Sequence, residues 1–164
     1  MSDTKDQVHR DLVANLDDEE ALEKMQKGWL AAGEWASAIE RMRTRRFADL
    51  PVAEGNRRVG ALLGERFLAS YEGQLARKSI ETLPKQVVFG KLVPMLGERL
   101  RQSIRFEWVA TDSGGILNIR GRRATPAEVT LGFFETIAGA SASPPVLALE
   151  IVDDELMILH IDGP

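Results

Sequence analysis

Cysteine is absent from this chain of 164 residues, histidine occurs twice and tyrosine once. Without cysteine the chain forms no disulfide, no thiolate metal site and no cysteine nucleophile. The two histidines, His9 and His160, lie at opposite ends of the sequence without histidine neighbours, so we predict no metal site. The sequence has no apolar run near the roughly 18 residues of a membrane span and no apolar signal-peptide core at its start. We therefore expect a cytoplasmic protein without a membrane span.

Basic residues are also absent from the last part of the chain, where Arg123 is the final one. The net charge is -4, yet residues 56–123 carry 13 Lys and Arg against 6 Asp and Glu, and residues 124–164 carry only acidic charges. A basic segment can attract an anion or a nucleic acid, but charge runs are usually solvated surface. Because the pI is about 5.3 and no recognition-helix or aromatic-sheet pattern occurs, we predict no nucleic-acid partner.

Familiar catalytic motifs are missing as well. The sequence contains no phosphate-binding glycine loop, no zinc-protease helix motif and no dinucleotide fingerprint. We predict that the chain is not an enzyme and holds no cofactor. The remaining catalytic candidates are Glu107 and Glu135, because each lies among apolar residues. A buried carboxylate beside an arginine would support acid–base chemistry, whereas a carboxylate that faces solvent or pairs with an arginine would not.

The first two thirds of the chain have the apolar spacing of helices. We expect a helix over residues 5–16, then either one helix of roughly 25 residues capped by Asp17 or Asp18, or two helices broken near Gly28 or Gly33. Asn56 is expected to cap a second long helix. Its apolar stripe consists of Val59, Leu62, Leu63, Phe67, Tyr71 and Leu75. A third helix is expected over about 86–102, with Pro94 as a candidate kink.

The character of the sequence changes in the last third, where "IRFEWVA" and "GILNIRG" alternate between polar and apolar residues, as strands do. The segments "IRFEWVA" and "GILNIRG" flank the turn "TDSGG" and predict one hairpin, and "VLALEIV" and "ELMILHI" predict a second. Between them, "TPAE" predicts a capping box with Thr125 as N-cap, Pro126 as first helical residue and Glu128 as third, opening a helix to about Ala140. The fold class is therefore α+β: a helical N-terminal half packed on a four-stranded antiparallel ββαββ sheet. We divide the chain into a helical arm, residues 1–46, and an α+β domain, residues 47–164.

Four arginines near the start of this predicted helix form a candidate anion site. A helix N-terminus presents free N–H groups, and Arg105 is expected to lie cross-strand from Arg120. The capping box, however, would already satisfy two N–H groups, and Glu128 would add a negative charge. We therefore favour a junction that turns the chain, with anion binding as the weaker hypothesis. The four candidate residues are Arg105, Arg120, Arg122 and Arg123.

The aromatic residues suggest two further sites beside an ordinary core. A cleft between helices and sheet could hold an apolar ligand, and its candidate lining is Phe67, Tyr71, Trp108 and Phe133. Trp29 and Trp35 are six positions apart, so they cannot share one tight face of a straight helix. An outward tryptophan on the arm would be a contact for a protein partner.

Three segments resemble a protein family largely restricted to myxobacteria: "RRVGALLGERFLASYEGQLARKS", "IRFEWVATDSGGILNIRG" and "GFFETIAGA". The resemblance covers about residues 47–162 and is carried by Gly60 to Tyr71 and Gly132 to Glu135. The order of elements is similar to a broader group that contains four-vinyl-reductase domains, haem nitric-oxide sensors and trafficking-particle subunits.

That resemblance implies an α+β domain that holds a hydrophobic ligand or haem, or binds partner proteins. Residues 10–159 contain no histidine, so we reject histidine-ligated haem. No catalytic residue transfers, because none is established for the similar family. We predict a non-catalytic regulatory, signalling or accessory protein that acts through protein–protein interaction and forms a homodimer or binds a partner. A sensor or carrier of a small hydrophobic ligand is the alternative, and an enzyme using a buried Glu with Arg is the second alternative.

Overall fold

The computed structural model describes residues 16–27, 30, 32–83, 87–93, 105–121, 125–141 and 143–162. The predicted helix over residues 5–16, except for its last residue, and the kink at Pro94 lie outside them. A short helix of residues 87–93 lies between the last N-terminal helix and the first strand. The other elements are α2 (Asp18–Gln26), α3 (Ala32–Arg46), α4 (Val52–Ala69), α5 (Tyr71–Thr82), β1 (Arg105–Thr111), β2 (Gly114–Arg120), α7 (Ala127–Ala138), β3 (Val146–Ile151) and β4 (Leu156–Asp162).

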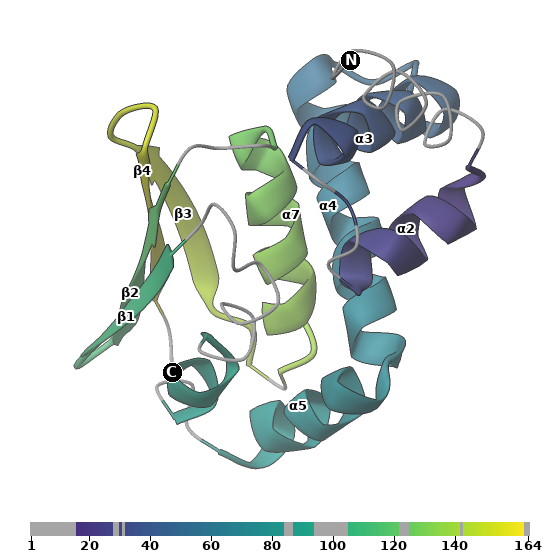
Figure 1. The fold of residues 1–164 in the computed structure, drawn as a ribbon. Helices are drawn as coiled ribbons and strands as arrows, with labels where there is room; N and C mark the ends of the chain where they lie inside the picture. The colour runs from purple at the N-terminus through teal and green to yellow at the C-terminus, as the bar shows by residue number, and fades with distance from the viewer. Residues whose placement is uncertain are drawn as a thin grey trace, which may run out of the picture.

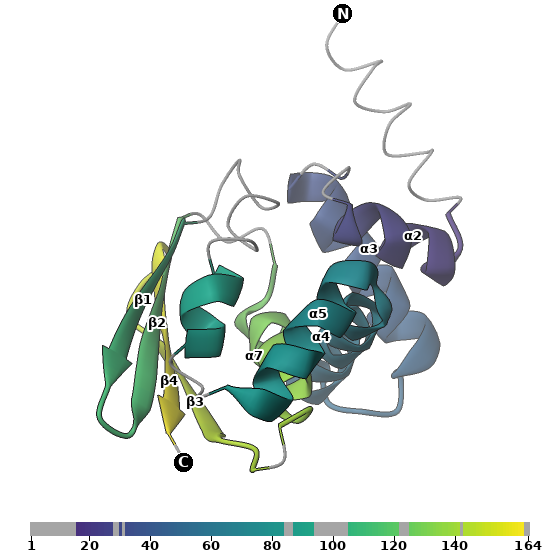
Figure 2. The same ribbon diagram turned by 90° about the horizontal axis from the view of Figure 1, so that it is seen from below.

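The predicted α+β fold is confirmed. The four strands form one antiparallel sheet in the order β1-β2-β4-β3, made of two hairpins joined through α7. In Figures 1 and 2, α7 and the helix of residues 87–93 lie against one side of the sheet, and α4 lies on the side of α7 that faces away from the sheet. Alternate residues of the central strands face these helices and are buried, as a half-covered sheet requires. They are Leu117, Ile119, Met157, Leu159 and Ile161.

Three glycines let the backbones of α4 and α7 touch. A Cβ on Gly60 would lie 2.0 Å from the carbonyl oxygen of Val129, and a Cβ on Gly132 would lie 2.0 Å from that of Arg57. Gly64 faces the Thr136 side chain at 2.8 Å in the same way. Because real Cβ atoms do not approach backbone oxygen this closely, larger residues would force the helices apart.

The helices α2 and α3 pack on the other side of α4. Asp17 caps α2 by accepting a hydrogen bond from the Glu20 N–H at 2.8 Å, and the Asp17 N–H donates to the Glu20 carboxylate, which completes a capping box. Two helices are present here, one of the two predicted alternatives, because α2 ends at Gln26 and α3 begins at Ala32; α3 itself ends at Arg46. A second apolar cluster joins these helices to α4 and α7: Ala21, Leu22, Met25, Ala38, Ile39, Met42, Val59, Leu63 and Val129.

The predicted second helix is wrong at its start and in its length. It begins at Val52 after Pro51, whose fixed φ suits a helix entry, and Asn56 is a buried residue inside it rather than its cap. It also ends at Ala69. Ser70 has an extended backbone and caps α5 by accepting a hydrogen bond from the Gly73 N–H at 3.1 Å. The predicted stripe therefore stops at Phe67, and Tyr71 is 76% exposed.

The predicted capping box of α7 is also wrong. Pro126 is the N-cap, with an extended ψ of 143°, and no side chain caps the helix. The proline therefore lies one position before the first helical residue, and Glu128 becomes the second helical residue instead of the third. The helix ends at Ala138, with Gly139 as C-cap, two residues before the predicted end.

The contact between α4 and α7 predicts an opposite response to alanine at two glycines. Gly60→Ala should lower the free energy of unfolding by about 1–3 kcal/mol, because the new methyl group meets a rigid backbone. Gly33→Ala is the matched control, since a Cβ there meets nothing within 4 Å. It should leave stability unchanged or raise it by up to about 1 kcal/mol. Urea unfolding followed by circular dichroism measures both, and equal effects would contradict the close contact.

Candidate functional site

The four residues of the predicted ligand pocket do not gather around one space. Phe67 and Phe133 contact each other with ring centroids 6.0 Å apart. Trp108 instead stacks on Phe89 at 5.1 Å, and its ring covers Gly115. Tyr71 is exposed on α5. Two of the four are therefore brought together, as part of the packed core.

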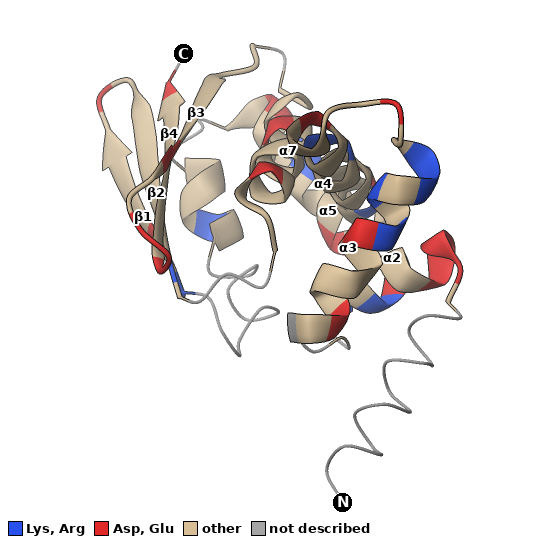
Figure 3. Cartoon of the chain, turned by 90° about the horizontal axis from the view of Figure 1, so that it is seen from above, with Lys and Arg blue, Asp and Glu red and all other residues tan. Residues whose placement is uncertain are grey.

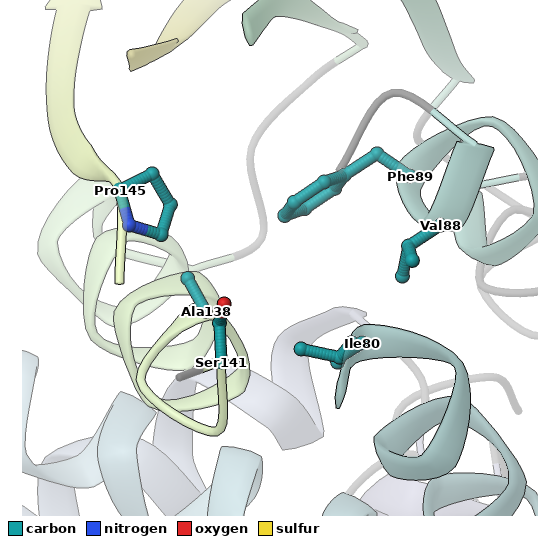
Figure 4. A pocket seen from close by; sticks show the side chains of 6 residues that line it. All are labelled: Ile80, Val88, Phe89, Ala138, Ser141 and Pro145. Carbon is teal, nitrogen blue, oxygen red and sulfur yellow. The ribbon is translucent and has the colours of Figure 1, made fainter. Parts of the chain in front are cut away.

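A small apolar hollow lies elsewhere, where α5, the helix of residues 87–93 and the end of α7 meet the start of β3 (Figure 4). Its volume is about 10 Å³, room for about one water molecule. None of the predicted pocket residues lines it. The lining consists of Ile80, Val88, Phe89, Ala138, Ser141 and Pro145.

The two candidate carboxylates occupy different surroundings, and neither is deeply buried. Glu107 is exposed on β1. Glu135 on α7 accepts a hydrogen bond from Arg57 Nε at 2.7 Å, and a second guanidinium nitrogen contacts its other oxygen. This two-pronged hydrogen bond raises the pKa of Arg57. The Glu135 carboxylate is thus held by the arginine and ties α7 to α4, beside the glycine contact.

The predicted anion site is described only in part. Arg105 and Arg120 are direct cross-strand partners, as predicted, and both are exposed. Arg122 and Arg123 lie outside the described residues. The first turn of α7 has no side-chain cap, contrary to the argument that weakened this site.

The structure also places one of the two predicted partner-binding tryptophans and one of the two histidines. Trp29 lies outside the described residues, whereas Trp35 is half-buried against the second apolar cluster. His160 and Glu150 are diagonal neighbours on β4 and β3, with Nε2 and Oε2 3.1 Å apart. Within the described ranges no three His, Cys, Asp or Glu side chains gather as metal ligands. No described helix is both long and apolar enough to cross a membrane.

Charged residues concentrate on the helices and leave the strands mostly uncharged, as Figure 3 shows. Several ion pairs connect different helices: Arg46 with Asp18 at 2.7 Å, and Arg66 with Glu19. The first pair joins α3 to α2, and the second joins α4 to α2. With the pair of Arg57 and Glu135, α4 is therefore tied to both α2 and α7. In β3 the single charged residue is Glu150.

Sequence reasoning missed the side of the sheet that faces away from α7. No described element covers it in Figures 1 and 2. Exposed large apolar side chains gather there and along β3: Val146 is 74% exposed, Ile151 55% and Val152 50%. The composition of "VLALEIV" could have revealed this feature, because only Glu150 is polar, whereas a sheet with one open face normally puts polar residues on it.

No described element pairs with the outer edge of β3. The Val152 N–H donates to the Leu156 carbonyl at 3.1 Å, so the even-numbered residues of this strand face β4. By the alternation of an antiparallel ladder, the N–H and C=O groups of Leu147, Leu149 and Ile151 point away from the sheet. No backbone hydrogen bond to them from another described element occurs. The free edge of β3 is therefore an apolar strand with open hydrogen-bonding groups.

Comparison of the chain with protein-family models and with curated proteins finds no match in either. The resemblance to the myxobacterial family remains a prediction that rests on the quoted segments.

The tie between Arg57 and Glu135 predicts a measurable energetic coupling. A double-mutant cycle with Arg57→Gln and Glu135→Gln should give about 0.5–1 kcal/mol, because both side chains remain partly exposed. The control cycle uses Arg58→Gln and Glu54→Gln, a pair within α4 at 3.5 Å. It should give about 0.3 kcal/mol. Unfolding in urea at low and high salt measures both, and a coupling no larger than the control would refute the tie.

Proposed function

We propose that the protein is a non-catalytic regulatory or accessory module that binds an extended polypeptide strand at the free edge of β3. The observation that carries the proposal is the exposed, almost uncharged β3 with its outward-pointing backbone groups. A strand added to such an edge gains main-chain hydrogen bonds, while alternate side chains of both strands meet on the two faces.

Two features of the described residues support binding rather than chemistry. The Glu135 carboxylate is engaged by Arg57, and Glu107 is open to solvent, so neither resembles an acid or base shielded from water. The apolar hollow holds about one water molecule, far below the several hundred Å³ of a ligand pocket. The exposed apolar surface of β3 is therefore a better candidate binding site than this hollow.

The other edge of the sheet is a poorer acceptor. Its strand, β1, carries Arg105 and Glu107, both exposed. Charged side chains on an edge strand are a common way to prevent pairing with another chain. The difference between the two edges favours β3 as the acceptor.

Site-specific photo-crosslinking in the native host tests this function. A benzoylphenylalanine at position 146 on β3 should give a discrete covalent adduct with a protein after irradiation. The matched control places the same residue at position 109 on β1, which is also exposed and apolar. It should give little adduct, because the partner pairs at the opposite edge. Equal adducts from both positions, or none from position 146, would overturn the proposal.

A further inference from the structure

We infer that the strand accepted by β3 is the β3 of a second copy of this chain, paired antiparallel about a two-fold axis at Leu149. The inference rests on the proposed function, since it names the partner of the same edge. It would join two four-stranded sheets into one continuous sheet with the helices of both copies on the same side.

The free backbone groups select the possible axes. Odd-numbered residues of β3 point outward, so in a symmetric antiparallel pair they must face odd-numbered residues of the second copy. The axis can then pass through an odd-numbered residue, in a hydrogen-bonded pair, or through an even-numbered one, in a non-hydrogen-bonded pair. With the axis at Leu149, Leu147 pairs with Ile151 of the second copy, and Leu149 pairs with Leu149. This register forms about six backbone hydrogen bonds between the copies.

The neighbouring registers are less favourable. An axis at Leu147 or at Ala148 would bring Pro145 into the ladder, and proline has no N–H to donate. An axis at Glu150 would place the two Glu150 carboxylates directly opposite each other. An axis at Ile151 would bring in the turn residues Asp153 and Glu155, which are exposed and acidic. The axis at Leu149 uses only apolar residues at the hydrogen-bonded pairs.

Side chains on the two faces also match in this register. On the helix-facing side, Leu147, Leu149 and Ile151 of each copy would cover one another, and Ile151 would lose much of its exposure. On the open side, Val146 would face Val152, and Ala148 would face Glu150. The single charge of β3 therefore meets a small apolar residue of the second copy and not another carboxylate, so like charges do not oppose each other.

A single cysteine provides the first test, because the natural chain has none and any disulfide must join two copies. Leu149→Cys places two sulfurs at a cross-strand pair whose Cα atoms are about 5.5 Å apart, within disulfide range. Mild oxidation of the purified protein should convert most of it to a covalent dimer. Val146→Cys is more exposed, but its two copies would be about 20 Å apart in this register, so it should stay monomeric on denaturing gels.

A charge exchange at exposed positions tests the same register without touching the core. Ala148→Glu places two carboxylates opposite each other and should weaken dimerisation about threefold to tenfold in sedimentation experiments. Adding Glu150→Lys to that variant restores an opposite-charge pair and should return the dissociation constant to within about twofold of the natural chain. Both positions are exposed in the single chain, so folding is retained.

The outcomes separate this inference from the proposed function. A purified protein that is monomeric at all concentrations overturns the second copy as partner, and a photo-adduct of another protein at position 146 would still uphold strand addition. A dimer that ignores the charge exchange and does not crosslink through Leu149→Cys overturns the register. Crosslinking at position 149 with loss and rescue by the charge exchange supports the inference.

Discussion

The backbone contact between α4 and α7 is the constraint on which the remaining packing depends. Gly60, Gly64 and Gly132 allow the two helices to approach until main-chain atoms touch. This approach makes α7 the middle layer of the molecule. Val129 on one side of α7 belongs to the cluster shared with α2 and α3, whereas Phe134 and Ile137 belong to the core under the sheet. A wider spacing would disturb both cores at once, because interiors are packed with few voids.

All described helices lie on the same side of the sheet, so no described element covers its other side. The helices α2 and α3 use their apolar faces against α4, and α4 uses its glycine face against α7. None remains for the far side of the sheet, where Val109 and Val146 are exposed. The open sheet side is thus a consequence of how the helical half packs. It is also where the apolar surface available for another polypeptide lies.

Elements with strong local signals were predictable from the sequence, and contacts between distant segments were not. Both hairpins and the Asp17 cap follow from alternation and short-range hydrogen bonding. The break at Ser70 was missed because the apolar spacing continues to Leu75 across it, although Gly73 must lie against the Phe67 carbonyl. The pairing of Glu135 with Arg57 spans 78 positions, and no local pattern encodes it. The four predicted pocket residues do not line one space. The end of α4 at Ala69 leaves Tyr71 exposed on α5, and Trp108 stacks on Phe89 instead.

The asymmetry between the two sheet edges decides what kind of assembly strand pairing can produce. Pairing of β3 with β1 of another copy would repeat indefinitely and build a filament. The growing assembly would always keep a free β3 at one end and a free β1 at the other, ready for the next copy. Arg105 and Glu107 on β1 oppose that outcome, as charged edge residues do. Pairing of β3 with β3 uses the same edge twice and closes after two copies. The placement of charge on one edge and apolar residues on the other therefore favours a closed pair over an open chain.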